Sequence, residues 1–600
     1  MRVWNIVYGI VCIASLFITP QKVWATGEFR EAYDVQYAVA PTGVTIVTQN
    51  VTLTNNQTNL YPQKYSIVID STKIKNVIAY DNGGVIRPQI SQTDGKTEIA
   101  LQFNEKNVGL GKSLRFSLRY ENTDIAQKNG SIWELNIPGV ADNPDLSDYV
   151  VSLSVPPTFG PNAYMSPPPQ ASGKWTKEQM IKGGISAAYG VSQQFNATLS
   201  YYVENPTVTS KTMEIALPPD TAFQKVAIIS LDPKPMTVLK DKDGNWLAQY
   251  SVGPSKKLSI TATLSVRIYM HPRENFDSGE IDTDLYTKPL KYWESNDAHI
   301  EELATLYNTP RAIYDYVTQT LTYDYARVNK SPIRKGALQS LASPQSSVCM
   351  EFTDLFIAIA RAAGIPAREA VGYAYTTNAK LRPLSLATDV LHSWPEYYDT
   401  GARAWIPVDP TWADTTGGVN YFDKLDFNHI VFSYYGASSD YPYPAGFYKK
   451  AGSSTKDITV QFADALREEK EGTVGISYMF PSSVTSGFTA SGSVVIENIS
   501  EVAMKRLSAT VQSTPVDVAL TIAIPDLPPY ARYSIPVSFH VPNFFSKNFG
   551  MIVTTVGEQS KRFDFTIVPL LYSFSIPIIG LAIGIGVLVY IGIRIHKWKQ

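Results

Sequence analysis

Cysteine is nearly absent from this chain, and its scarcity limits the chemistry available. The 600 residues contain two cysteines, Cys12 and Cys349. Cys12 lies in an N-terminal segment that we expect to be removed, so the mature chain keeps Cys349 alone and has no internal disulfide. An exported protein without disulfides is more typical of a bacterial or archaeal surface than of a eukaryotic secretory pathway. A lone thiol in an oxidising compartment invites oxidation, so its retention calls for a function.

The chain also lacks an excess of either charge. Its formal net charge is -2, which gives no electrostatic reason to expect a nucleic-acid partner. Histidine is scarce too, with six scattered residues. Because one cysteine remains and no acidic loop resembles an EF-hand, the sequence predicts no metal site and no cofactor. Calcium bound at other loops is left open.

The N-terminal segment has the pattern of a signal peptide. Arg2 is followed by an apolar run from Ile6 to Ile18 and by the small residue Ala25, which predicts a signal peptide over residues 1–25. The alternative is an uncleaved anchor, but this run is too short to cross about 30 Å of hydrocarbon at about 1.5 Å per residue.

The C-terminal segment has the pattern of a membrane anchor. Residues 572–593 are uncharged, and Arg594, Lys597 and Lys599 follow them. This pattern predicts a transmembrane helix over residues 569–593 and a cytoplasmic tail over residues 594–600, with a buried core helix as the alternative. We therefore expect a single-pass protein of the cell membrane, with the bulk of the chain extracytoplasmic.

Three regions have the alternating pattern of β-strands. Apolar residues alternate through residues 33–39, 258–268 and 533–541. They predict a β-sandwich domain over residues 26–156, a second β-rich region over residues 157–290, and an immunoglobulin-like β domain over residues 446–568. Whether the first two regions form two sandwiches or one elaborated sandwich is left open.

Between these regions the period changes to that of helices, which predicts an α+β domain over residues 291–445. Thr309-Pro310 has the pattern of an N-cap and first helical residue. Farther on, Phe352, Leu355, Phe356 and Ile359 recur at three- and four-residue steps. They predict one apolar helix face, with Gly364 ending the helix.

Cys349 stands at the N-terminus of that predicted helix. The unpaired amides and the positive end of the helix dipole favour a thiolate there, which is the nucleophilic form. The same amides can face an oxyanion that develops on an attacked carbonyl. We therefore interpret Cys349 as a nucleophile, in preference to a small buried apolar residue.

A thiolate nucleophile needs a proton donor for the leaving amine, and His392 is the best candidate. Residues 391–398 read as one strand and residues 404–409 as a second, with a turn at Thr400-Gly401 between them. A hairpin of these strands could place Asp409 beside His392, where a carboxylate would orient the imidazole. The alternatives are a core histidine and an aspartate that forms a turn before Pro410.

These motifs resemble the transglutaminase-like superfamily over about residues 309–414. The resemblance rests on Cys349 with the run Arg361-Ala-Ala-Gly-Ile-Pro-Ala-Arg368, on His392-Ser-Trp394, and on Trp405-Ile-Pro-Val-Asp-Pro-Thr411. It implies a papain-like core with the catalytic residues Cys349, His392 and Asp409, in which the cysteine attacks a carboxamide. The acyl group then passes to an amine or to water.

Several neighbouring residues carry smaller expectations. Many relatives have glycine where Ser347 stands, and Pro395 removes a strand donor, so we expect an edge or bulged strand there. The second oxyanion donor is not assigned, although Gln345 could serve. We interpret Glu351 as a partner of the helix dipole. His429 is interpreted as structural, and the three tryptophans Trp394, Trp405 and Trp412 as core residues that could line a cleft.

The leading hypothesis is a surface-tethered thiol acyltransferase, protease or amidase that acts on protein or peptide substrates. The rival hypothesis is a non-catalytic adhesion or scaffold protein that uses its β domains, because most of the chain lies outside the resemblance. Thiol reactivity separates them, since a helix N-terminus beside imidazolium favours a reactive thiolate.

Overall fold

The computed structural model describes residues 27–598, apart from gaps at 275, 277–280, 329–332, 376–390, 417–418, 423–424, 451–452, 454, 464, 469 and 517. The predicted signal peptide at 1–25 lies outside the described residues. The chain forms two compact units. The first holds Met1–Ala126, Pro138–Pro156 and Pro168–Ile181, and the second holds Gln127–Ile137, Pro157–Pro167 and Lys182–Gln600.

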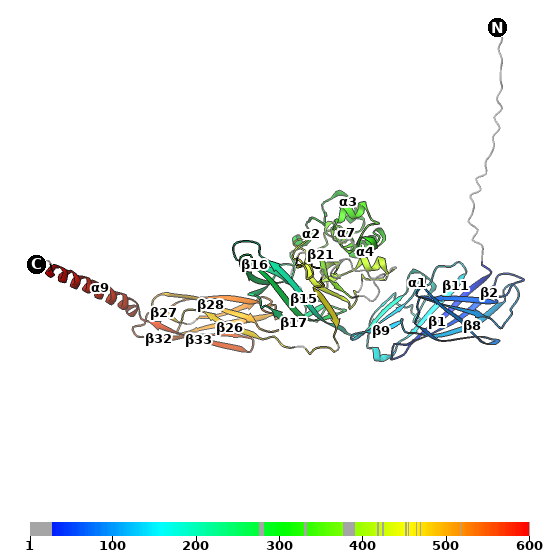
Figure 1. Ribbon diagram of the computed structural model, residues 1–600, viewed down its shortest axis with the longest axis horizontal. Coiled ribbons are helices and arrows are strands. Elements are labelled where there is room, and N and C mark those ends of the chain that lie inside the picture. The colour runs from blue at the N-terminus through cyan, green and yellow to red at the C-terminus, as the bar shows by residue number, and fades with distance from the viewer. Residues whose placement is uncertain are drawn as a thin grey trace, which may run out of the picture. The chain divides into compact units, whose positions relative to one another are not determined.

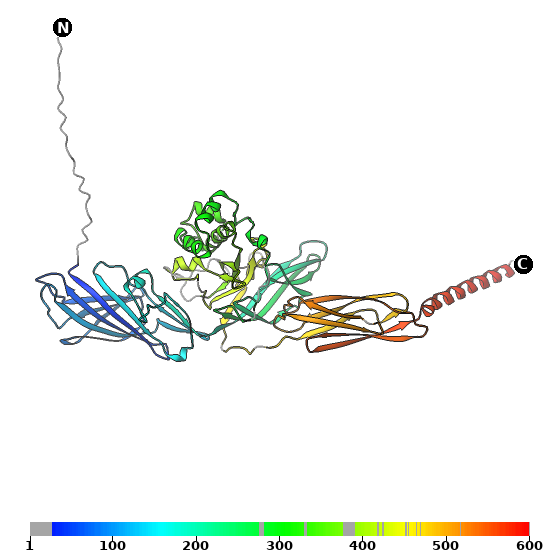
Figure 2. The same cartoon turned by 180° about the vertical axis from the view of Figure 1, so that it is seen from behind.

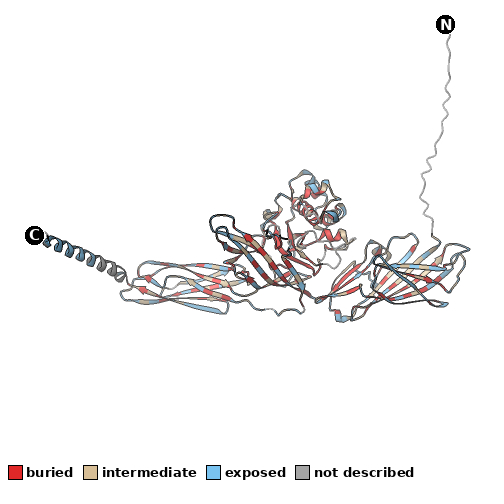
Figure 3. Ribbon diagram, in the orientation of Figure 1, coloured by how far each residue is buried: buried red, intermediate tan, exposed pale blue. Residues whose placement is uncertain are grey.

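The first unit is built on a seven-stranded sheet in the order β13-β11-β1-β2-β8-β4-β5 and a three-stranded sheet in the order β3-β7-β6. The strands are β1 (Phe29–Val39), β2 (Thr45–Asn55), β3 (Lys64–Ile69), β4 (Ile74–Asp81), β5 (Gly84–Ile86), β6 (Gln89–Thr93), β7 (Lys96–Gln102), β8 (Ser113–Asn122), β11 (Leu146–Ser154) and β13 (Lys174–Trp175). Helix α1 (Lys177–Lys182) follows them. Buried and less buried residues alternate along β2 and β8, as expected for strands with one face on a core (Figure 3).

The second unit begins with three sheets, in the orders β12-β14-β10-β9, β17-β20-β15-β25 and β16-β19-β18. Their strands are β9 (Ala126–Asn129), β10 (Ile132–Ile137), β12 (Asn162–Ser166), β14 (Ile185–Tyr189), β15 (Ser192–Glu204), β16 (Lys211–Leu217), β17 (Gln224–Asp232), β18 (Thr237–Lys240), β19 (Trp246–Val252), β20 (Lys257–Tyr269) and β25 (Ile458–Phe462), with a short 3-10 helix at Pro157–Phe159. Apolar residues of β15 and β20 alternate between buried and less buried positions and form one core with those of β16, β17 and β19.

The chain ends in two further sheets and a helix. The sheets have the orders β26-β28-β31 and β27-β33-β32-β29-β30. Their strands are β26 (Val474–Met479), β27 (Ser483–Thr485), β28 (Thr489–Asn498), β29 (Leu507–Thr514), β30 (Val518–Ile524), β31 (Arg532–His540), β32 (Asn548–Val556) and β33 (Gln559–Val568). Helix α9 (Leu570–Trp598) follows and covers residues 570–593 of the predicted anchor at 569–593. Among the described residues, however, no helix has the length and apolar character needed to cross a membrane, so the predicted anchor is not supported.

The helices gather with a four-stranded sheet in the order β23-β22-β21-β24. The strands are β21 (Ala367–Ala374), β22 (Leu391–Asp399), β23 (Ala404–Pro407) and β24 (His429–Tyr435). The helices are α2 (Thr283–Thr287), α3 (Ala298–Leu306), α4 (Pro310–Thr320), α5 (Tyr325–Val328), α6 (Ala337–Ala342), α7 (Cys349–Ala362) and α8 (Pro410–Thr415). Helices α3, α4 and α7 lie together beside β21 (Figures 1 and 2), and α7 packs on β21 and β22.

Helix α7 is buried more completely than its sequence pattern predicts. The predicted apolar face is buried, but Glu351, Thr353 and Asp354 are buried as well. The polar residues are accommodated by partners. Arg327 lies 3.0 Å from Glu351, and Arg334 forms an ion pair with Asp354. The helix is therefore central to the domain, and its first residue is held inside the protein.

The strand expectation at Pro395 is corrected by the sheet order. β22 is an inner strand that pairs with β21 and β23, with Pro395 opposite Glu369 of β21. The pairing with β23 runs only from Glu396 to Asp399. Pro395 therefore lies beyond the end of that pairing, where a missing N–H is tolerated.

Candidate active site

Cys349 is the first residue of α7 and is 1% exposed. Val348 caps the helix, and its amide N donates a hydrogen bond of 2.8 Å to Oε2 of Glu351. The preceding loop is fixed by residues 322–324, because Asp324 N donates to Ser347 O at 2.7 Å. Ser347 pairs with Tyr323 as an isolated parallel bridge and has no positive φ, so serine fits where many relatives have glycine. Glu351 thus accepts a hydrogen bond from the backbone amide of the residue that caps the helix.

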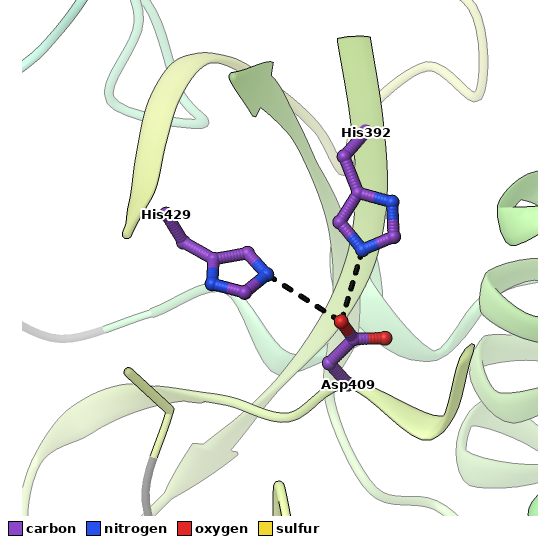
Figure 4. Close-up of side chains that lie close together, drawn as sticks. All are labelled: His392, Asp409 and His429. Carbon is purple, nitrogen blue, oxygen red and sulfur yellow. Dashed lines mark hydrogen bonds and ion pairs between the residues drawn. The ribbon is translucent and has the colours of Figure 1, made fainter. Parts of the chain in front are cut away.

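His392 and Asp409 are brought together by the β22–β23 hairpin. Asp409 follows β23 as the N-cap of α8, where its Oδ1 accepts hydrogen bonds from Thr411 N at 2.9 Å and Trp412 N at 3.0 Å. Its Oδ2 lies 2.9 Å from His392 Nε2 (Figure 4). The two oxygens of one carboxylate therefore cap a helix and hold an imidazole, and both side chains are fully buried.

The His392 ring interacts with both Asp409 and Cys349. Burial would lower the pKa of His392, but the charge and hydrogen bond of Asp409, together with those of Cys349, raise it to about 9. The charge of Asp409 therefore favours the cationic form of this imidazole. An imidazolium beside the sulfur favours the thiolate form and is ready to protonate a leaving group.

His429 is the first residue of β24, and from the sequence we interpret it as structural. In the structure it is a third member of this cluster. Its Nε2 lies 3.4 Å from Oδ2 of Asp409, the oxygen that also faces His392 (Figure 4). Its Nδ1 lies 2.7 Å from Oδ1 of Asp426. Burial opposes the charge of Asp409, but the two histidines hold the pKa of its carboxyl well below the ordinary value. The spacing of Asp426 and His429 before an apolar strand was the available signal, and it is weak.

Tyr323 is the second residue that the sequence did not single out. It is 5% exposed, and its hydroxyl has no hydrogen-bond partner among the described residues. Burial raises the pKa of Tyr323 strongly, and the charge of Cys349 is the next contribution. A buried donor is therefore within electrostatic range of the thiol, whereas Gln345, the donor considered from sequence, lies exposed in a turn.

Aromatic rings enclose the imidazoles. Trp412 and Trp394 stack on His392 with ring centroids 5.1 Å and 5.9 Å away, and both also contact His429. Trp394, Trp405 and Trp412 are all buried. Such rings keep water from the hydrogen bonds of the cluster and strengthen its electrostatic interactions.

The two histidines and Asp409 also resemble a set of metal ligands, because one donor atom from each lies within 4.8 Å of the others. Both imidazole nitrogens, however, face the same carboxylate oxygen. The 2.9 Å distance to His392 is that of a hydrogen bond, and we assign the cluster no metal.

Comparison with known proteins identifies the domain that carries this site. Residues 297–410 match the family described as the transglutaminase-like superfamily. No curated protein matches the chain.

Two solved structures with which the chain shares a likeness are distant from it. A candidate cysteine protease from Cytophaga hutchinsonii is 18% identical, with 46% of this chain and 98% of that chain covered and a TM-score of 0.25. The CARDB domain of a Pyrococcus furiosus protein is 13% identical, with 17% and 95% covered and a TM-score of 0.15. Scores this low carry no argument about fold or function. The assignment of the domain rests on the family match instead. Residues 297–410 of this chain are a transglutaminase-like domain that includes Cys349, His392 and Asp409.

Proposed function

We propose that this chain is a thiol enzyme that attacks a carboxamide or peptide bond through Cys349 and forms an acyl-enzyme. The observation that carries the proposal is the position of His392, whose buried ring interacts with Cys349 and is held 2.9 Å from Asp409. A thiol nucleophile, an imidazole and an orienting carboxylate are the parts that acyl transfer requires.

The proposed reaction has two steps. The Cys349 thiolate attacks the carbonyl carbon, and His392 gives its proton to the departing amine or ammonia, which leaves a thioester on the sulfur. His392, now neutral, then takes a proton from an incoming amine or water, which attacks the thioester and releases Cys349 as the thiolate, so that the thiolate and imidazolium are restored. An amine acceptor gives a cross-link, and water gives deamidation or proteolysis.

The negative oxygen formed in each step needs hydrogen-bond donors. One donor in this proposal is a backbone amide in the first turn of α7, because amides at a helix N-terminus point out of the helix toward a nearby negative charge. Tyr323 supplies the second donor in this proposal, because its buried hydroxyl is unpaired among the described residues and lies within electrostatic range of the thiol. A donor aimed at the developing charge contributes about 10²–10³ in rate.

The test uses alkylation of Cys349 by iodoacetamide, which needs no substrate. The wild-type thiol should react rapidly well below the ordinary thiol pKa of about 8.5, and His392→Ala should lose this reaction at low pH. Glutamine peptides are then screened for ammonia release and for amine incorporation, with Cys349→Ala as the control. If the wild-type thiol and the His392→Ala thiol both titrate like a free peptide cysteine, the enzyme proposal fails.

The rival proposal, a non-catalytic adhesion or scaffold protein, is favoured by the extent of the β sheets outside the domain. It predicts an ordinary thiol and binding that is unchanged in Cys349→Ala. Binding of the wild type and this variant to candidate surface proteins, measured in parallel with alkylation, separates the two proposals.

We also propose that the protein is located outside the cytoplasm. This proposal rests only on the signal-peptide pattern of residues 1–25. Fractionation of cells that produce the full chain tests it. Recovery of the protein in the cytoplasmic fraction would contradict an extracytoplasmic location.

A further inference from the structure

The Asp409 carboxylate has more partners than a catalytic triad needs. Oδ1 accepts two backbone hydrogen bonds at the start of α8, and Oδ2 faces His392 at 2.9 Å and His429 at 3.4 Å (Figure 4). The proposed reaction uses the His392 side alone. His429 therefore requires a separate explanation.

His429 is itself held in place by hydrogen bonds. Its Nδ1 lies 2.7 Å from Oδ1 of Asp426, and the same oxygen accepts the amide of Asn428 at 2.8 Å. The side chain of Asn428 donates to Glu134 of β10 at 2.7 Å. His429 and Asp426 are each 4% exposed. The ring is thus fixed at one nitrogen, and its other nitrogen is presented to Asp409.

The contacts of this ring favour a charged pair over simple packing. The ionisable side chains that interact with His429 are Asp426 of the preceding loop and Asp409 before α8, with His392 of β22 at a ring distance of 5.5 Å. From the other packed elements it meets the uncharged rings of Trp394 and Trp412. Both of its direct ionisable partners are therefore carboxylates, and apolar burial alone would not need two of them.

We propose that His429, held by Asp426, is a positioning residue of the active site that fixes the Asp409 carboxylate in its charged form toward His392. This inference rests on the proposed function. The cluster then runs Asp426, His429, Asp409, His392 and Cys349, and each group orients the next. Removal of His429 leaves Oδ2 of Asp409 with one of its two imidazole partners, and the carboxylate is less well fixed toward His392.

The titration behaviour of the ring agrees with this geometry. Burial would lower the pKa of His429, but the charge of Asp426 and the interactions with Asp409 raise it to about 9. A cation on each side of Oδ2 keeps the buried carboxylate ionised. A charged Asp409 in turn keeps His392 protonated, which is the form that pairs with the thiolate.

The test compares two substitutions of this residue. His429→Gln keeps an N–H that can reach Asp409, whereas His429→Phe keeps the ring volume and removes the donor. Val431→Ala is the matched control, because Val431 is a buried residue of the same strand outside the cluster. Alkylation of Cys349 by iodoacetamide is followed from pH 5 to pH 9, and thermal unfolding is measured for each variant.

We expect His429→Phe to react about tenfold more slowly than wild type at pH 6 but at a similar rate at pH 9. His429→Gln should recover most of the rate at pH 6, and Val431→Ala should lower the unfolding temperature without moving the pH profile. With a substrate in hand, kcat should fall in His429→Phe while KM stays unchanged. A purely structural role would not produce this pattern.

A His429→Phe profile that coincides with wild type, while His392→Ala shifts its profile, overturns the inference and leaves the proposed function intact. If His392→Ala shifts nothing either, the proposed function itself fails. Should His429→Phe not fold, Asp426→Asn takes its place, because it leaves the ring present but removes its charged partner. A slower reaction at pH 6 then supports the inference, and an unchanged profile overturns it.

Discussion

Two buried groups of charged residues lie next to adjacent residues of β22, and they hold charge in different ways. On one side, Ser393 donates to Glu369 at 2.6 Å, and Arg334 forms ion pairs with both Glu369 and Asp354. On the other side, His392 meets Asp409 and His429. Successive residues of a strand point to opposite faces, so one strand separates the two groups.

The difference between these groups lies in the type of cation. The Arg334 guanidinium stays charged at any accessible pH, so its group can support the helix but cannot exchange protons in a reaction. Imidazole can gain and lose a proton, and the pKa of His392 is raised only to about 9, so the His392 group can take part in acid and base chemistry. Buried charge by itself therefore does not distinguish a site for acid and base chemistry from a structural ion pair. The two are distinguished by whether the cation can release its proton, as imidazole can and guanidinium cannot.

The largest effect should come from Asp409→Asn. Asparagine can still cap α8, so the fold should persist, but it cannot supply the negative charge beside His392. We expect kcat to fall by about 10⁴, as when an orienting aspartate is replaced in other triads, together with loss of rapid alkylation at pH 6. The measurements are turnover of an identified substrate and iodoacetamide labelling. Full activity in this variant would remove Asp409 from the site.

Arg334→Met should affect stability and leave the chemistry in place. Loss of one partner from a buried ion pair leaves two carboxylates uncompensated and costs about 3–5 kcal/mol. Denaturant unfolding measures this cost, and the pH profile of Cys349 alkylation should remain that of wild type. A shifted profile would mean that the two groups are coupled across β22.

Tyr323→Phe should lower kcat by about 10²-fold, because it removes a donor to the developing oxyanion. Alkylation by iodoacetamide passes through no oxyanion, so its rate should stay near that of wild type. The ratio of the two rates is the measurement. Equal losses in both would indicate that Tyr323 affects the thiol and not the transition state.

The smallest effect concerns the pH dependence of stability. His392 and His429 each have a pKa raised to about 9 in the folded chain, against about 6.5 when unfolded. Their stabilisation is complete below pH 6.5 and is lost as the pH rises through 9. Between pH 6.5 and pH 9 the unfolding temperature of wild type should therefore fall by a few degrees more than that of the double variant His392→Ala/His429→Gln. Arg334→Met should keep the wild-type slope.

Part of the site follows from local sequence. Helix α7 begins at Cys349 because the apolar residues that follow have helical spacing and Gly364 ends the pattern. The hairpin that joins His392 to Asp409 follows from a short turn between two strands. These features depend on neighbours within about 20 residues, a distance over which periodicity and turn signals operate.

The remaining parts of the site depend on tertiary structure. Tyr323 comes within electrostatic range of the thiol because its segment pairs with Ser347, and His429 lies beside Asp409 from β24. No local period links either residue to the triad. The apolar C-terminal segment shows the converse, because its composition predicted an anchor and the described residues contain no helix suited to span a membrane.

The double use of Asp409 has a consequence for the newly made chain. Its Oδ1 caps α8 and its Oδ2 orients His392, so the groups that activate the thiol come into register only when this helix has formed. Under the proposed function, Cys349 would therefore gain its reactivity only once α8 has formed, and an incomplete chain would be protected from unwanted acyl transfer.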